Sequence, residues 1–362
     1  MATSNLNSNP EITKKILSLG LISNDPFILF DIGASQGIES HWKIFQPFFK
    51  AYGFDPLVKE MHRLNNLETN PNIKYFDAFI TSNDIKENLS RYWFPNSYQR
   101  STAMYAGEII NKPYKLNFNN NDSDMIESNN KFSIDDFCIN NHDINNIDFI
   151  KIDTDGHDLD VINGSLKSLK DKNVLGLFVE CQFQGPLSDD SNSFYNIDKV
   201  LRNNGFSLFD LETYRYSKKA LPDNFYYDIF AQTKNGQVLA GDALYIRDYM
   251  AEGYSNKFCT LSNDKLLKLI CIFEIYGLYD CAAEIIIYLN KNNCLNNMVT
   301  KDFLDILTKK YHKDIASYDE LIRLFNNNPQ KFFPHNEIIQ KLNKIELIKK
   351  IYKLMRSFFF KK

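Results

Sequence analysis

The sequence predicts a doubly wound α/β domain, with a mostly parallel sheet covered by helices on both faces, followed by a small helical appendage. Apolar strand-like runs alternate with amphipathic segments over residues 27–79 and 133–203, a pattern typical of parallel strands joined by crossover helices. Two later strand-like runs, 206–214 and 242–247, bring the expected sheet to seven strands. From Thr260 onward apolar residues recur at helical spacing.

The individual elements follow in chain order. A short helix over residues 12–21 leads into the first strand. The earlier strands are expected at 27–32, 50–55, 72–79, 147–153 and 174–183, and the helices at 37–49, 57–68, 133–140, 158–170 and 194–203. Residues 81–130, rich in Asn and Asp, are expected to form loops over the ligand cleft, where the aromatic residues within 91–94 would stack on a sugar or pack a lid.

Length and composition indicate more than one unit. A chain of 362 residues exceeds most single cores, so we expect a lead-in over 1–24, a main domain over 25–250, a helical domain over 251–335 and a basic amphipathic helix over 336–362. The six cysteines form no Cys-x-x-Cys pair, which favours reduced thiols in a cytoplasmic protein and argues against zinc. Neither a signal peptide nor an apolar run of about 18 residues is visible.

The net charge of −3 is unevenly distributed. Residues 341–362 hold eight Lys and Arg against the single acid Glu346, so the rest of the chain is acidic. An acidic body argues against nucleic-acid binding, which needs a broad basic surface. The tail also repeats apolar residues at helical spacing, a pattern that suits a lipid surface, ordinary packing or a dimer.

The most informative segment is Phe30-Asp31-Ile32-Gly33-Ala34-Ser35-Gln36-Gly37, which joins an apolar strand to an expected helix. Glycines there let the backbone approach a cofactor, and the first helical N–H groups would face it. The next strand ends in Asp55, whose carboxylate can bind ribose hydroxyls. By themselves these motifs indicate an adenosine-type cofactor.

A second segment, residues 147–165, carries the densest ionisable cluster: Asp153, Asp155, His157 and Asp158. Together the two segments resemble the FkbM family of class I S-adenosylmethionine-dependent methyltransferases, over about residues 25–235. The family typically shows a strand ending Lys-Ile-Asp, then acid, Gly, acid and a helix closed by Gly-Ala or Gly-Ser. This chain departs at Ser35-Gln36 and where Asp155, His157 and Asp158 replace Glu, Ala and Glu.

The resemblance implies a Rossmann-like seven-stranded methyltransferase sheet with S-adenosyl-L-methionine as cofactor. It implies that the methionine part is held by Asp31 and by the backbone of the loop, where an ammonium finds an acceptor and a carboxylate finds N–H donors. Asp55 would take the ribose, and Asp77 with Ala78 would lie beside the adenine. For each aspartate the alternative is a helix cap or a loop acid. The residues expected at the cofactor are Asp31, Gly33, Ala34, Ser35, Gly37, Asp55, Asp77 and Ala78.

A hydroxyl acceptor must lose its proton, and His157 is the first choice as base, with Asp153 and Glu180 as further catalytic candidates. Alternatively, Thr154, Asp155 and Asp158 cap the following helix and His157 lies on its solvated first turn. A magnesium ion held by Asp153 with Glu180 or Asp155 is a further alternative, whereas a calcium loop is excluded by the position of the glycine. No metal is expected.

The sequence therefore predicts a cytoplasmic O-methyltransferase whose acceptor is a hydroxyl of a sugar or surface-glycan precursor, which includes a lipid-linked one. Residues 336–362 would hold it at the inner face of the membrane, and a homo-oligomer is left open. One alternative is an NAD-dependent oxidoreductase, although Gly33-x-x-x-Gly37 lacks the spacing that suits a pyrophosphate. Another is a non-catalytic scaffold in glycan assembly.

Overall fold

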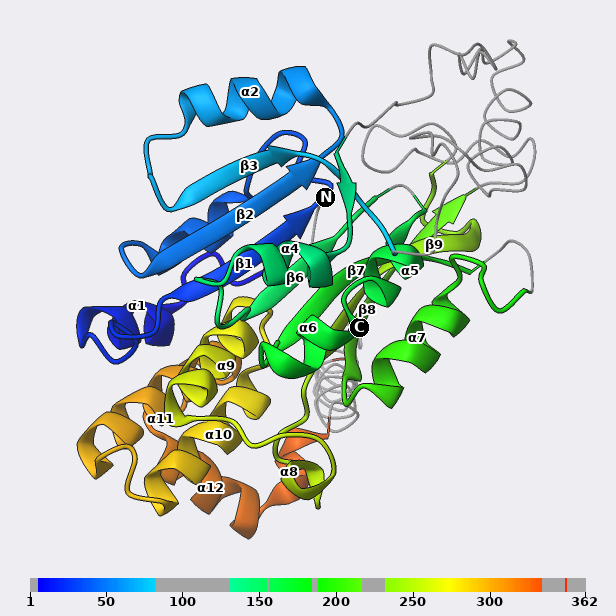
Figure 1. Cartoon of the computed structure of the whole chain (residues 1–362). Coiled ribbons are helices and arrows are strands. Elements are labelled where there is room, and N and C mark those ends of the chain that lie inside the picture. The colour runs from blue at the N-terminus through cyan, green and yellow to red at the C-terminus, as the bar shows by residue number, and fades with distance from the viewer. Residues whose placement is uncertain are drawn as a thin grey trace, which may run out of the picture. The chain divides into compact units, whose positions relative to one another are not determined.

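The computed structural model describes residues 6–82, 130–154, 156–183, 188–216, 232–333 and 349 (Figure 1). The chain divides into two compact units, residues 1–278 and 279–362. The first unit contains a seven-stranded sheet in the order β3-β2-β1-β6-β7-β9-β8. Only β9 runs antiparallel to its neighbours. The predicted fold class is confirmed.

The bounds of the elements place the sheet and its covering helices. The strands of the main sheet are β1 (Phe27–Ile32), β2 (Phe49–Asp55), β3 (Ile73–Asp77), β6 (Phe149–Ile152), β7 (Gly176–Gln182), β8 (Ser207–Tyr216) and β9 (Gln237–Ile246). β4 (Phe79–Ile80) and β5 (Lys131–Phe132) form a separate pair. The helices are α1 (Glu11–Ser18), η1 (Ser40–Phe45), α2 (Val58–Leu67), α4 (Ile134–Asn140), α5 (Asp158–Asn163), α6 (Leu166–Asp171), α7 (Phe194–Asn203), α8 (Tyr254–Lys257) and α9 (Asn263–Ile275).

Side chains alternate between the two faces of the sheet. One set, which includes Phe30, Ile150 and Leu177, joins the main hydrophobic core with residues of α4 to α7. On the opposite face the rings of Phe149 and Phe178 stack on Tyr276, which follows α9. The sheet is thus covered on both sides, as parallel strands require.

Two predicted helices differ from the structure. The helix expected at 37–49 is only the short 3-10 helix η1, because Pro47 disfavours a helical conformation at Gln46, whose ψ is 140°. The helix expected at 158–170 is divided into α5 and α6 around Gly164. A Cβ at Gly164 would lie 2.3 Å from the backbone oxygen of Thr81, so this position must stay bare where the chain passes β4.

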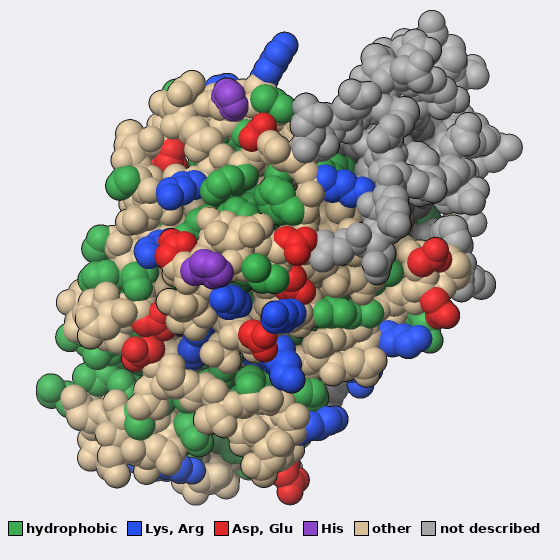
Figure 2. Space-filling view, in the orientation of Figure 1, with side chains coloured by type: hydrophobic (Ala, Val, Ile, Leu, Met, Phe, Trp, Pro, Cys, Tyr) green, Lys and Arg blue, Asp and Glu red, His purple; other side chains and the backbone are tan. Residues whose placement is uncertain are grey.

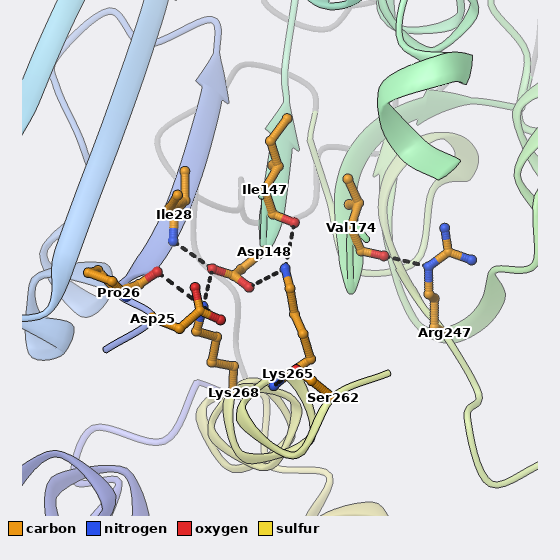
Figure 3. Close-up of polar contacts among 10 residues, drawn as sticks. All are labelled: Asp25, Pro26, Ile28, Ile147, Asp148, Val174, Arg247, Ser262, Lys265 and Lys268. Carbon is orange, nitrogen blue, oxygen red and sulfur yellow. Dashed lines mark hydrogen bonds and ion pairs between the residues drawn. The ribbon is translucent and has the colours of Figure 1, made fainter. Parts of the chain in front are cut away.

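α9 belongs to the first unit, beyond the predicted boundary at residue 250. Two of its lysines, Lys265 and Lys268, reach the buried carboxylate of Asp148, which precedes β6 (Figure 3). Arg247, just after β9, donates from Nε to Val174 O in the same region. These contacts tie the segment after the last strand to the edge where β1 and β6 begin.

The second unit consists of α10 (Tyr279–Lys291), α11 (Asn297–Tyr311), α12 (Tyr318–Asn327) and the 3-10 helix η3 (Pro329–Phe332). Within the described residues, no helix combines the length and apolar character that crossing a bilayer requires. The predicted helix 336–362, apart from Lys349, and the aromatic residues 91–94 lie outside the described residues. Acidic and basic side chains are interspersed on the face of the molecule in Figure 2.

Candidate active site

The loop between β1 and η1, residues 33–37, is fixed by contacts that only glycine permits. Gly33 has a φ of +87°, and a Cβ atom there would lie 1.9 Å from the backbone oxygen of Asp153. Gly37 has a φ of +89° and donates its N–H to Ala34 O. The end of β1 therefore lies directly against the end of β6, so the two sequence motifs meet at the carboxyl edge of the sheet.

The amides of this loop have acceptors inside the protein. Gly33 N and Ala34 N both donate to Phe54 O, at 2.9 and 3.0 Å. Ser35 N donates to Oδ2 of Asp55 at 3.2 Å. The sequence led us to expect these N–H groups to face a ligand, whereas the structure uses them to hold the loop on β2. The reason is that buried amides must find partners.

Asp55, Asp77 and Ala78 come together at the ends of β2 and β3. Asp55 is 6% exposed, and its Oδ1 accepts from Leu57 N at 2.9 Å. Asp77 lies opposite Asp55 in the strand register, and Ala78 N donates to Asp55 O at 3.2 Å. The acid predicted for the ribose and the pair predicted for the adenine are therefore neighbours on adjacent strands.

Lys151, which sequence reasoning missed, connects the two motifs. Its Nζ lies 3.1 Å from Asp31 Oδ1 and 3.6 Å from Asp153 Oδ2, and its side chain is 8% exposed. The signal in the sequence was an ionisable residue inside the otherwise apolar strand Phe149–Ile152. Lys151 thus pairs across β1 and β6 and fixes both carboxylates at the sheet edge.

Burial governs the charges of this pair. It raises the pKa of Asp31 to about 6, against the opposing effect of the Lys151 ammonium. Burial acts to lower the pKa of Lys151, but the carboxylates of Asp31 and Asp153 hold that pKa above its ordinary value. At neutral pH both partners are charged, and Asp31 is a carboxylate that can accept hydrogen bonds.

Thr154 and Asp158 brace the turn before α5. The Asp158 Oδ1 atom accepts from the N and Oγ1 of Thr154, at 3.1 and 3.0 Å, and Thr154 Oγ1 accepts from His157 N at 3.1 Å. Asn192 donates to Asp158 Oδ2 at 3.0 Å. Burial, and then the nearby charge of Asp153, raise the pKa of Asp158 to about 6. The capping alternative describes Thr154 and Asp158 well.

His157 is placed differently from either expectation. Its side chain is 5% exposed, so it does not lie on a solvated turn. The ring meets Phe79 edge-on with centroids 5.3 Å apart, and Nδ1 lies 3.5 Å from Asp160 Oδ2. Asp153 is the more accessible of the two, with 15% of its side chain exposed.

Four carboxylates lie level with one another across four strands. Glu180 of β7 opposes Asp242 of β9, and Asp242 opposes Glu212 of β8. Asp153 follows Ile152, which opposes Val179, and so comes level with Glu180. We call Asp153, Glu180, Asp242 and Glu212 the acid row. Residues opposed in a sheet share one face, and Lys151 and Asp31 lie on that same face.

Asp242 is the most perturbed member of the acid row. It is 3% exposed, and Oδ2 accepts a hydrogen bond from the phenol of Tyr214. Burial raises the pKa of Asp242 to about 7; Asp153 and Glu212 raise it further, while Tyr214 and Lys151 oppose them. Perturbed groups of this kind gather at functional sites. Sequence reasoning missed Asp242, although an acid among the apolar residues of β9 was a visible signal.

No three His, Cys, Asp or Glu side chains within the described ranges converge on a position that suits a metal ion. Asp155, one of the ligands in the magnesium alternative, lies outside these ranges. The acid row is an extended line of carboxylates, and a line of that kind suits an extended polar molecule better than a single small ion.

Three solved structures illustrate the fold similarity. They are the magnesium protoporphyrin IX methyltransferase of Synechocystis PCC 6803 with bound S-adenosylmethionine (11% identity, 66% of this chain and 80% of that one, TM-score 0.28), a S-adenosylmethionine-dependent methyltransferase of Aquifex aeolicus (12%, 67% and 98%, 0.27), and the N-terminal domain of EvdMO1 with S-adenosylhomocysteine (9%, 67% and 82%, 0.28). Similarity this low does not bear on substrate. No curated protein matches the chain.

The family comparison is more specific. The methyltransferase FkbM domain matches residues 31–208, a range that begins at Asp31 and includes the loop, Lys151, Asp153 and Glu180. The structure brings these residues to one edge of the sheet. This chain belongs to the FkbM family of methyltransferases.

Proposed function

We propose that the protein transfers a methyl group from S-adenosylmethionine to an oxygen, a hydroxyl of a sugar or surface-glycan precursor. The observation that carries the proposal is the convergence of Asp31, Asp55 and Asp77 at or near the carboxyl ends of three adjacent parallel strands. In open α/β sheets, ligands bind at that edge, where the strand order reverses. Here the reversal occurs between β1 and β6.

The residues present fit the cofactor. The buried carboxylate of Asp31 suits the ammonium of the methionine part, and Asp55 suits the ribose hydroxyls. Asp77 and Ala78 offer acceptors and an apolar contact for the adenine. When bound, S-adenosylmethionine supplies a methyl group on a positively charged sulfur. The protein must then place a hydroxyl oxygen near this carbon and exclude water.

Transfer to a hydroxyl releases one proton. Asp153 is our choice as proton acceptor, because it stands at the sheet edge beside Lys151 and is more exposed than His157. Glu180 comes next in the acid row and serves to orient the acceptor. The glycan class of the acceptor rests on the family resemblance.

The oxidoreductase alternative has less support. A dinucleotide pyrophosphate binds at an α-helix N-terminus after a Gly-x-Gly-x-x-Gly loop. Here the loop leads into a six-residue 3-10 helix, and the described loop amides bond to β2 and its neighbours. The scaffold alternative is disfavoured because the strand-end acids and glycines are all retained.

Thermal unfolding with S-adenosylhomocysteine or NAD tests the cofactor. A saturating excess of S-adenosylhomocysteine should stabilise the protein by a few kcal/mol, about 3 at 100 times the dissociation constant. Asp55→Ala should remove most of this shift, while Asp143→Ala, at an acid away from the site, should retain it. A shift with NAD and none with S-adenosylhomocysteine would reject the proposal. The acceptor is then sought by following formation of S-adenosylhomocysteine with a panel of sugars.

A further inference from the structure

The acid row extends well past the region that the donor needs. Strands in a sheet lie about 4.8 Å apart, so Asp153 and Glu212 are separated by roughly 14 Å across β6, β7, β9 and β8. The acids assigned to the donor lie on β1, β2 and β3, on the other side of β6. Glu180, Asp242 and Glu212 therefore lie on the side of Asp153 away from the donor, where an acceptor would enter.

A buried amide beside the row needs an oxygen. Gln182 is 6% exposed, and within the described residues its Nε2 donates to no acceptor. Because side chains alternate along β7, Gln182 shares the face of Glu180, one step further along. It opposes Ala240, which opposes Tyr214. The small alanine leaves the amide and the phenol facing each other across a low floor. A buried donor in that position is satisfied by an oxygen of a bound molecule.

The electrostatic environment of the row is negative. Burial raises the pKa of Tyr214, and the carboxylates of Asp242, Glu212 and Glu180 raise it further. Burial raises the pKa of Tyr276 as well, and its charged described neighbours, Asp242 among them, are all acids. Asp242 itself is held at a raised pKa for want of nearby positive charge. A cation placed here would be stabilised by each of these groups.

We propose that Glu180, Asp242 and Glu212, together with Gln182 and Tyr214, form the acceptor subsite, and that it takes a sugar carrying a protonated amine. This inference rests on the proposed function. The ammonium would lie along the carboxylates, and a ring or hydroxyl oxygen would accept from Gln182 Nε2. A phosphorylated sugar with its phosphate in the subsite would face repulsion from the acid row and is excluded from it.

Three sugars that differ only at carbon 6 test the charge preference without any variant. We would titrate 6-amino-6-deoxy-D-glucose, D-glucose and D-glucose 6-phosphate, at neutral pH, into the full chain saturated with S-adenosylhomocysteine. The amino sugar should bind about tenfold or more tighter than glucose, and the phosphate more weakly than both. Equal binding of the amino sugar and glucose, or no binding of any of the three, would overturn the subsite.

Asp242→Asn locates the preference. Asparagine has nearly the same shape and still accepts from Tyr214, so the variant should fold, which a melting curve checks. Its preference for the amino sugar should fall to within about twofold, with the affinity for S-adenosylhomocysteine unchanged. Asp210→Asn, an acid two residues before Glu212 on β8, is the matched control and should keep the preference. A preference that survives Asp242→Asn refutes the assignment, whereas loss of S-adenosylhomocysteine binding by the wild-type chain would instead refute the proposed function.

Discussion

Lys268 Nζ lies 3.0 Å from Asp148 Oδ2, and neither side chain is exposed. Lys265 Nζ lies 2.6 Å from the other carboxylate oxygen, and Ile28 N donates to Oδ2 at 2.7 Å (Figure 3). One aspartate thus joins α9 to the start of both β1 and β6. A buried carboxylate with two lysines is tolerated because each charged group has a partner.

Asp148→Asn should destabilise the first unit by about 3–5 kcal/mol, because it leaves the ammonium groups of Lys265 and Lys268 buried without this counter-charge. Urea unfolding measures the change. Asp25→Asn is the control, since Asp25 pairs with Lys268 at 2.8 Å but is 22% exposed. Its cost should be nearer 1 kcal/mol. Equal costs would show that the pairing at Asp148 has no special role in attaching α9.

Gly33→Ala should be far more damaging than Gly253→Ala. Both glycines have a positive φ, and alanine there costs about 1–2 kcal/mol. At Gly253 a Cβ meets nothing within 4 Å, whereas at Gly33 it meets the backbone of Asp153 at 1.9 Å. Thermal unfolding should show a small loss for Gly253→Ala, and a loss more than twice as large for Gly33→Ala, with S-adenosylhomocysteine binding lost as well. Similar melting temperatures would contradict this placement of the loop.

Asp242 should make the protein less stable as the pH rises. Its pKa is about 7 in the folded chain against 3.8 when free, so its contribution is fully present below about pH 4 and is lost as the pH passes 7. The shift is worth on the order of 4 kcal/mol. Urea unfolding from pH 4 to 8 should show a weaker decline in Asp242→Asn than in the wild type. Parallel curves would mean that Asp242 titrates normally.

Asp148 provides the opposite sign in the same experiment. Burial acts to raise its pKa, but Lys265 and Lys268 hold it below the ordinary value. Its contribution is therefore present above about pH 4 and lost only at lower pH. Between pH 5 and 8 the gap between the wild type and Asp148→Asn should stay constant.

Asp153→Asn should lower turnover about 100-fold with an acceptor found in the sugar screen, as expected for loss of a general base. His157→Ala should lower it less than about tenfold, because the ring lies against Phe79 and Asp160. Affinity for S-adenosylhomocysteine, measured by titration, should be retained in His157→Ala. The reverse ranking would return the role of base to His157.

The basic tail should bind anionic membranes. Each Lys or Arg near such a surface contributes about 1 kcal/mol, and an apolar stripe adds burial. Sedimentation with vesicles rich in phosphatidylserine compares the full chain with one stopped after Phe333. Only the full chain should sediment, and it should cease to do so with neutral vesicles. Equal behaviour of the two chains would exclude the tail as an anchor.

The sequence alone determined the fold class and the location of the donor site. Apolar runs have a short period, and glycine and acidic residues at strand ends have few other uses, so local patterns sufficed for β1, β2 and the segment at Asp153. The first helix was wrong because Pro47 prevented it from continuing, which the apolar pattern of 38–49 concealed.

Only the tertiary structure decided which side chains meet. Lys151 and Asp31 are 120 positions apart, and Asp242 joins Tyr214 and Glu180 through a register that nothing in the local sequence fixes. The same holds for Asp148, whose partners come from α9 after the last strand. Charge, burial and pKa depend on distances in space, and pairing of strands far apart in the chain sets those distances.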